Sequence, residues 1–130
     1  MVANFSQRYR RRGEQVMRAV EREVIGAAVG ANGFTTIAQA DALAQRLELR
    51  RGRRLLDVGS GRGWPGLYLA RKTGCEVVAS DVPVLALRSA LSAARRQRLG
   101  RRSSFVVSSG THLPFRTGTF DAVVHTDVLC

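Results

Sequence analysis

The sequence predicts an α/β protein in which a parallel β-sheet has helices on both faces and follows an N-terminal helical lead-in. Two observations support this fold class. Short apolar runs bounded by turn residues alternate with longer segments whose apolar residues recur every three or four positions. The segments follow one another as helix, strand, helix, strand, helix, strand, strand, which is the order expected of parallel strands joined by right-handed helical crossovers.

The N-terminal part of the sequence is predicted to be helical. Residues 7–29 place apolar side chains at helical spacing between arginines and glutamates, which predicts an amphipathic helix. A second helix is expected after Thr36, because Gln39 follows three positions later in the pattern of a capping box. We therefore divide the chain into a helical lead-in, residues 1–50, and a sheet-containing region, residues 51–130.

Strands and helices alternate in the second region. Four strands are expected, at residues 54–58, 75–80, 104–108 and 121–125. A helix over residues 67–72 should end at Gly74, and a last helix should open at Pro83 and end at Gly100. The inner face of that last helix is expected to consist of Val84, Leu87, Leu91, Ala94 and Leu99.

Composition excludes several classes of protein. The formal net charge is +11, but nucleic-acid binding is disfavoured as the main function because the arginines are scattered and no aromatic side chains alternate with them to stack bases. The sequence has no run of 18 apolar residues and no secretory signal pattern, so we expect a cytoplasmic protein without a membrane segment. Cys75 and Cys130 lack metal-ligand spacing and are expected to be reduced thiols, with no metal site.

A glycine-rich stretch, DVGSGRGWPG, follows the first expected strand. Its glycines fit two patterns. Gly59, Gly61 and Gly63 form G-x-G-x-G, whereas Gly61, Gly63 and Gly66 form the dinucleotide-type G-x-G-x-x-G. Both patterns imply a nucleotide-like ligand at the carboxyl end of the strand.

The pattern that starts at Gly59 is favoured. The other pattern would extend the strand through Gly59 and Ser60, which have low strand propensity. Counted from Gly59, the strand ends at Val58 and the third glycine of the dinucleotide motif falls on Trp64, whose indole does not permit a close helix approach. A nicotinamide-dependent oxidoreductase that uses Gly66 remains the alternative.

Three motifs in order resemble one family. The stretch LLDVGSGRGWPGLYLA resembles the first motif of class I S-adenosylmethionine (SAM)-dependent methyltransferases, with the acidic Asp57 two residues before the first glycine. Asp81 closes the second expected strand, as the acidic ribose ligand of that family does. LPFRTGTFDAVVHTDVL resembles the segment between the third and fourth strands of methyltransferase-11-like members, and ANGFTTIAQADALAQRL resembles the helical lead-in of some bacterial members. The resemblance extends from about residue 14 to residue 130.

The resemblance implies a Rossmann-like fold and methyl transfer from SAM to an unidentified acceptor, which we expect to be a small molecule. The family sheet has the strand order 3-2-1-4-5-7-6, so the four strands expected here would form a partial sheet, 3-2-1-4. On this comparison residues 51–130 form the N-terminal half of a methyltransferase domain, and the chain resembles a product truncated after the fourth strand. Ala122, Val123 and Val124 would then form an edge strand open to self-association.

The resemblance also implies which residues bind the cofactor. Asp57 would help to hold the ammonium end of SAM. Gly59, Ser60, Gly61 and Gly63 would line its methionyl and ribose parts.

Further cofactor contacts are expected beyond the second, third and fourth strands. Asp81 can accept both ribose hydroxyls in charge-assisted hydrogen bonds, although it is also placed to cap the helix after it, and Val82 would offer adenine an apolar wall. Ser109 and Gly110 fall near adenine in the resemblance, and His125 falls near the methyl group. No general base is assigned, because the need for one depends on the acceptor. A non-catalytic or truncated cofactor-binding module that pairs with another chain is the main alternative function.

Overall fold

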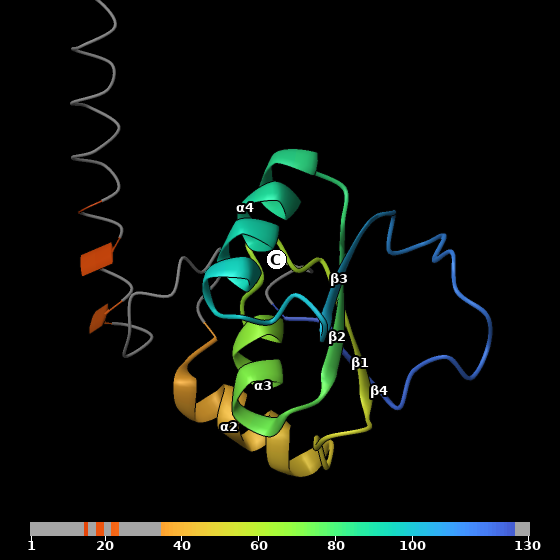
Figure 1. Cartoon of the computed structure of the whole chain (residues 1–130), viewed down its shortest axis with the longest axis horizontal. Helices are drawn as coiled ribbons and strands as arrows, with labels where there is room; N and C mark the ends of the chain where they lie inside the picture. The colour runs from red at the N-terminus through yellow and green to blue at the C-terminus, as the bar shows by residue number, and fades with distance from the viewer. Residues whose placement is uncertain (1–14, 16–17, 20–21, 24–34, 127–130) are drawn as a thin grey trace, which may run out of the picture.

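The computed structural model describes residues 15, 18–19, 22–23 and 35–126 of the chain (Figure 1). Most of the helix expected over residues 7–29 lies outside these residues, and the five described positions within it are helical. None of the described helices is long and apolar enough to cross a membrane. The proposed division at residue 50 stays a prediction.

The sheet contains four parallel strands in the order β3-β2-β1-β4, as the sequence predicts (Figure 1). Its strands are β1 (Arg54–Val58), β2 (Glu76–Asp81), β3 (Ser103–Val107) and β4 (Ala122–Val124). Three strands lie within one residue of their predicted positions. The fourth is shorter than predicted by one residue at each end, and the Asp121 carboxylate accepts a hydrogen bond from the Arg54 N–H just before β4 begins.

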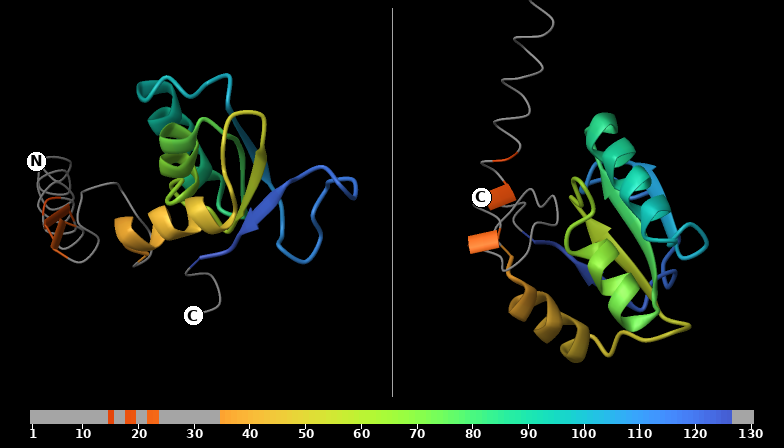
Figure 2. Two further views of the ribbon diagram at one scale, coloured as in Figure 1. Left: turned by 90° about the horizontal axis from the view of Figure 1, so that it is seen from below. Right: turned by 60° about the vertical axis from the view of Figure 1, so that its left-hand side comes forward.

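Two helices, α3 (Gly66–Thr73) and α4 (Val84–Arg96), cover one face of the sheet, and α2 (Ile37–Arg46) packs beside α3 on the same side (Figure 2). The capping box of α2 is present as predicted, since Thr36 Oγ1 accepts from Gln39 N at 3.1 Å and Gln39 Oε1 accepts from Thr36 N at 2.9 Å. The opposite face carries the loop formed by residues 108–121 rather than a helix of the described chain (Figure 2).

The last helix opens at Pro83 as predicted but differs from its prediction at its carboxyl end and on its inner face. It ends at Arg96 instead of Gly100, because Arg98 adopts a left-handed φ of 58° and Leu99 N donates to Ala94 O. Val84, predicted on the inner face, is 47% exposed, whereas Ala90, which the prediction omitted, is fully buried. Val84 is exposed because the first turn of α4 extends beyond the packed core.

A cluster of polar and aromatic side chains joins α2 to α3. Tyr68 Oη donates to Asp41 Oδ1 at 2.6 Å, and Lys72 Nζ lies 2.5 Å from the same oxygen. The ring of Trp64 lies beside that of Tyr68, with centroids 5.2 Å apart, and Trp64 Nε1 donates to the carbonyl oxygen of Thr35 at 2.8 Å. The segment around α2 is therefore held both to α3 and to the loop that precedes α3.

Candidate functional site

The candidate site lies at the carboxyl ends of β1 and β2. The chain order of the strands runs outward from β1 through β2 to β3, and then returns to place β4 on the other side of β1. Ligands of open parallel sheets bind at such a reversal of strand order, beyond the carboxyl ends of the strands. The loop of residues 59–65 leaves β1 at this point and leads into α3 (Figure 2).

The glycine loop has the backbone that the favoured pattern predicts. Gly59, Gly61 and Gly63 have φ angles of 70°, 53° and 100°, which is the left-handed region that glycine tolerates best. The N–H groups of Gly59 and Ser60 both donate to the carbonyl oxygen of Ser80, at 2.7 and 3.1 Å. The loop is thus hydrogen-bonded to the backbone of β2 near its carboxyl end, and its conformation depends on the glycines.

Gly66 has a structural role that the sequence interpretation missed. A Cβ atom added to Gly66 would lie 2.5 Å from Asp57 Oδ2 and 3.1 Å from Asp57 Cβ, and the Gly66 N–H donates to that carboxylate oxygen at 3.0 Å. The start of α3 therefore packs directly on the Asp57 side chain. The G-x-x-G spacing of Gly63 and Gly66 was the available signal, but it was assigned only to the dinucleotide alternative.

Asp57 is enclosed by the fold. Its side chain points toward α3 and is 1% exposed, and its second oxygen, Oδ1, has no hydrogen-bond partner among the described residues. Burial raises the pKa of Asp57 to about 8 and the negative charge of Asp81 acts in the same direction, against the lowering effect of the Gly66 hydrogen bond. Ser60 is also fully buried, and its Oγ has no hydrogen-bond partner within the described structure.

Asp81 connects β2 to the glycine loop. Its Oδ2 accepts from Gly61 N at 2.7 Å and its Oδ1 accepts from Val82 N at 2.8 Å. The alternative role as a helix cap is wrong, because the N-cap position of α4 is Pro83 and no side chain caps it. The carboxylate lies at the rim of the loop, where each oxygen accepts one backbone hydrogen bond, and Val82 beside it is 61% exposed.

The loop after β3 brings further predicted residues to the same end of the sheet. A Cβ atom on Gly110 would lie 3.3 Å from Val58 Cγ1, so Gly110 lies against the last residue of β1. Ser109 is exposed, and its Oγ is hydrogen-bonded to Thr111 Oγ1 at 2.8 Å. His125 is exposed just beyond β4. Across residues 35–126 no three His, Cys, Asp or Glu side chains cluster closely enough to hold a metal ion.

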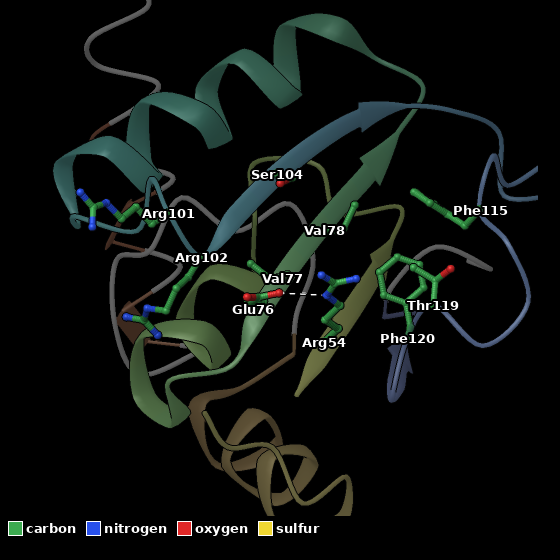
Figure 3. A pocket seen from close by; sticks show the side chains of 10 residues that line it. All are labelled: Arg54, Glu76, Val77, Val78, Arg101, Arg102, Ser104, Phe115, Thr119 and Phe120. Atoms are coloured by element: carbon green, nitrogen blue, oxygen red, sulfur yellow. Dashed lines mark hydrogen bonds and ion pairs between the residues drawn. The ribbon is translucent and has the colours of Figure 1, made fainter. Parts of the chain in front are cut away.

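A separate hollow lies on the face that the described helices leave open (Figure 3). It has a volume of about 420 Å³ and is bordered by the amino ends of β1 and β2, at Arg54 and Glu76, and by the side chains of Phe115 and Phe120. These two phenyl rings meet edge to face, with centroids 4.9 Å apart. Because Asp57 and Asp81 lie at the other ends of the same strands, this hollow is distinct from the candidate site.

Fold and site together define an open, parallel α/β domain whose first strand leads into a glycine loop at the reversal of strand order. The chain belongs to the methyltransferase domain family, since residues 56–130, more than half of its length, match the model of that family.

Individual proteins with similar sequences or structures support this family assignment. The methyltransferase GfsG of Streptomyces halstedii is 37% identical over 83 residues, which are 64% of this chain and 30% of GfsG. Two solved structures share the fold. The [4+2]-cyclase SpnF is 34% identical, with a TM-score of 0.62 over 66% of this chain and 32% of SpnF. A geranyl diphosphate methyltransferase in complex with SAM is 26% identical, with a TM-score of 0.63 over 68% of this chain and 36% of its own. The chain thus spans about a third of the length of each.

Proposed function

We propose that the chain binds SAM at the glycine loop and belongs to an enzyme that transfers its methyl group to a small-molecule acceptor. The observation that carries the proposal is the contact between Asp81 and Gly61, which places a carboxylate at the rim of a loop with three left-handed glycines. Membership of the methyltransferase family and the likeness to a methyltransferase in complex with SAM support the choice of this ligand over other nucleotides.

The residues present fit an adenosyl ligand. The buried oxygens Asp57 Oδ1, in β1, and Ser60 Oγ, in the loop, are polar atoms without partners in the described structure, and the glycines of this loop allow close approach. Asp81 would accept the ribose hydroxyls, and Gly59, Gly61 and Gly63 would line the methionyl chain. Asp57 would compensate the ammonium charge.

The adenine end would lie between elements that follow β2 and β3. Val82 would cover one side of the base, with Ser109 and Gly110 at its edge, and His125 would lie toward the methyl group. SAM supplies a methyl group that is already activated on a sulfonium, so the acceptor atom forms the new bond as the C–S bond breaks. The chain's own residues orient the two reactants and exclude water. No described residue is assigned as general base.

The proposal is tested by calorimetric titration of the purified chain with S-adenosylhomocysteine, with NAD as the comparison ligand. We expect saturable binding of S-adenosylhomocysteine and none of NAD. Preferential binding of NAD would support the dinucleotide alternative. Affinity for nucleic acid that falls steeply with salt, without affinity for adenosyl ligands, would support an arginine-driven nucleic-acid binder instead.

A module that binds the cofactor without methyl transfer and pairs with another chain is the second candidate function. Two observations favour it. Among the described residues β4 pairs only with β1, and Val123 on β4 is 54% exposed. The family likeness also includes SpnF, which is named as a cyclase. A cytoplasmic location stays a prediction from the sequence.

Self-association through β4 leads to a specific expectation for Val123→Lys. A lysine on an exposed edge strand opposes strand pairing, so the variant should be more monomeric than the unmodified chain at equal concentration. Sedimentation velocity over a range of concentrations measures this. Val107→Lys is the matched control, because Val107 is 55% exposed on β3 at the opposite edge. An unmodified chain that is monomeric throughout, or an equal effect of both variants, would contradict pairing through β4.

A further inference from the structure

Two side-chain oxygens, one in β1 and one in the glycine loop, are buried without hydrogen-bond partners among the described residues. Asp57 Oδ1 and Ser60 Oγ have no hydrogen-bond partner within the described part of the chain, and the two side chains are 1% and 0% exposed. Unsatisfied buried polar atoms are rare in folded proteins, so their presence calls for an explanation. Here one lies at the end of β1 and the other in the loop after it, both of which the proposed function assigns to the cofactor.

The surroundings of Asp57 disfavour a negative charge. Its carboxylate receives one hydrogen bond, from Gly66 N, and no cation pairs with it in the described structure. The charged group that acts on it is Asp81 from β2, which is also negative. Arg62 in the loop and His125 beyond β4 are exposed, and the first turn of α3 has no charged residue. Burial with this geometry raises the pKa of Asp57 to about 8, a direction that favours the protonated carboxyl.

We propose that Asp57 couples ligand binding to proton release: the free chain keeps Asp57 protonated, and an adenosyl ligand with an ammonium group displaces that proton to solvent. The inference rests on the proposed function, because it requires the cationic end of the ligand to lie near the loop. Atoms and charge balance in this step. The O–H bond of the Asp57 carboxyl breaks, the proton goes to the buffer, and the ammonium charge compensates the carboxylate that remains.

The coupling depends on the ligand's cation and not on its adenosine. For S-adenosylhomocysteine, the affinity should rise as the pH increases toward 8, by up to about tenfold per pH unit, and then level off once Asp57 is ionised in the free chain. 5′-Methylthioadenosine has the nucleoside and thioether but no ammonium group. Its binding should release no proton.

Calorimetric titration at pH 7, in a series of buffers with different ionisation enthalpies, measures the number of protons released. For S-adenosylhomocysteine we expect a value close to one, and for 5′-methylthioadenosine a value close to zero. Asp57→Asn should abolish the release, because asparagine still accepts from Gly66 N but carries no titrating proton. Glu76→Gln, at the other end of β2, should leave it unchanged.

The outcomes separate the inference from the function on which it rests. Binding of S-adenosylhomocysteine with no dependence on buffer would overturn the proton coupling and leave the proposed function standing. Equal proton release with both ligands would also overturn it, and this comparison uses the unmodified chain, so it holds even if Asp57→Asn does not fold. Absence of any binding would overturn both.

Discussion

Gly66→Ala is expected to destabilise the fold by about 1–3 kcal/mol, the usual cost of adding an atom to a packed interior. The new Cβ would lie 2.5 Å from Asp57 Oδ2, so that either α3 must move away from β1 or the Asp57 side chain must turn. Either response strains the hydrogen bond from Gly66 N to Asp57. The stability that is lost comes from the packing of the start of α3 on Asp57 in β1.

Chemical denaturation followed through the emission of Trp64, the one tryptophan of the sequence, measures this loss. Gly100→Ala is the matched control, because a Cβ on Gly100 meets no atom within 4 Å. It should change the free energy of unfolding by less than about 0.5 kcal/mol. If the two variants unfold at the same denaturant concentration, the close packing of α3 on Asp57 is wrong.

Asp81→Asn is expected to weaken S-adenosylhomocysteine binding by tenfold or more. Hydrogen bonds to a charged acceptor contribute about 1.5–3 kcal/mol each, and about 1.4 kcal/mol corresponds to a factor of ten in affinity. The asparagine removes the charge and one of the two acceptor oxygens that a ribose diol would use. Its one carbonyl oxygen can still accept from Gly61 N, which keeps the contact to the loop, while the hydrogen bond from Val82 N to the other oxygen is lost.

Glu76→Gln provides the comparison for charge. Glu76 lies on the same strand, at its amino end, and pairs with Arg54 at 3.0 Å on an exposed surface. Its replacement should leave the affinity for S-adenosylhomocysteine unchanged. Equal weakening by both variants would mean that the net charge of the chain, and not the position of Asp81, governs binding.

Much of the fold could be predicted from the sequence because its signals are local. The apolar run of β1 is bounded by charged residues and glycines, and the structure places the strand at the predicted residues, Arg54–Val58. The capping box at Thr36 is a contact between residues three positions apart, so it needed no tertiary information. The strand order was available only through the resemblance to a family.

The errors arose where tertiary contacts decide. The end of α4 depends on the left-handed backbone of Arg98, a conformation that an arginine side chain does not signal. The role of Gly66 depends on the distance between α3 and Asp57, two elements that sequence spacing relates only loosely. The role of Asp57 at the ammonium end of SAM stays a prediction, and the absence of a partner for its Oδ1 among the described residues could be seen only in three dimensions.

An NMR titration of the ¹⁵N-labelled chain with S-adenosylhomocysteine tests most directly whether the glycine loop and Asp81 hold an adenosyl ligand. We expect the amide signals of Gly59, Gly61, Gly63 and Val82 to shift together, because the Gly61 N–H donates to Asp81 in the free chain. The signals of Thr119 and Phe120, beside the hollow on the opposite face, should stay in place. Shifts confined to that hollow, or no shift at the glycine loop at saturating ligand, would mean that the loop does not hold the adenosyl ligand.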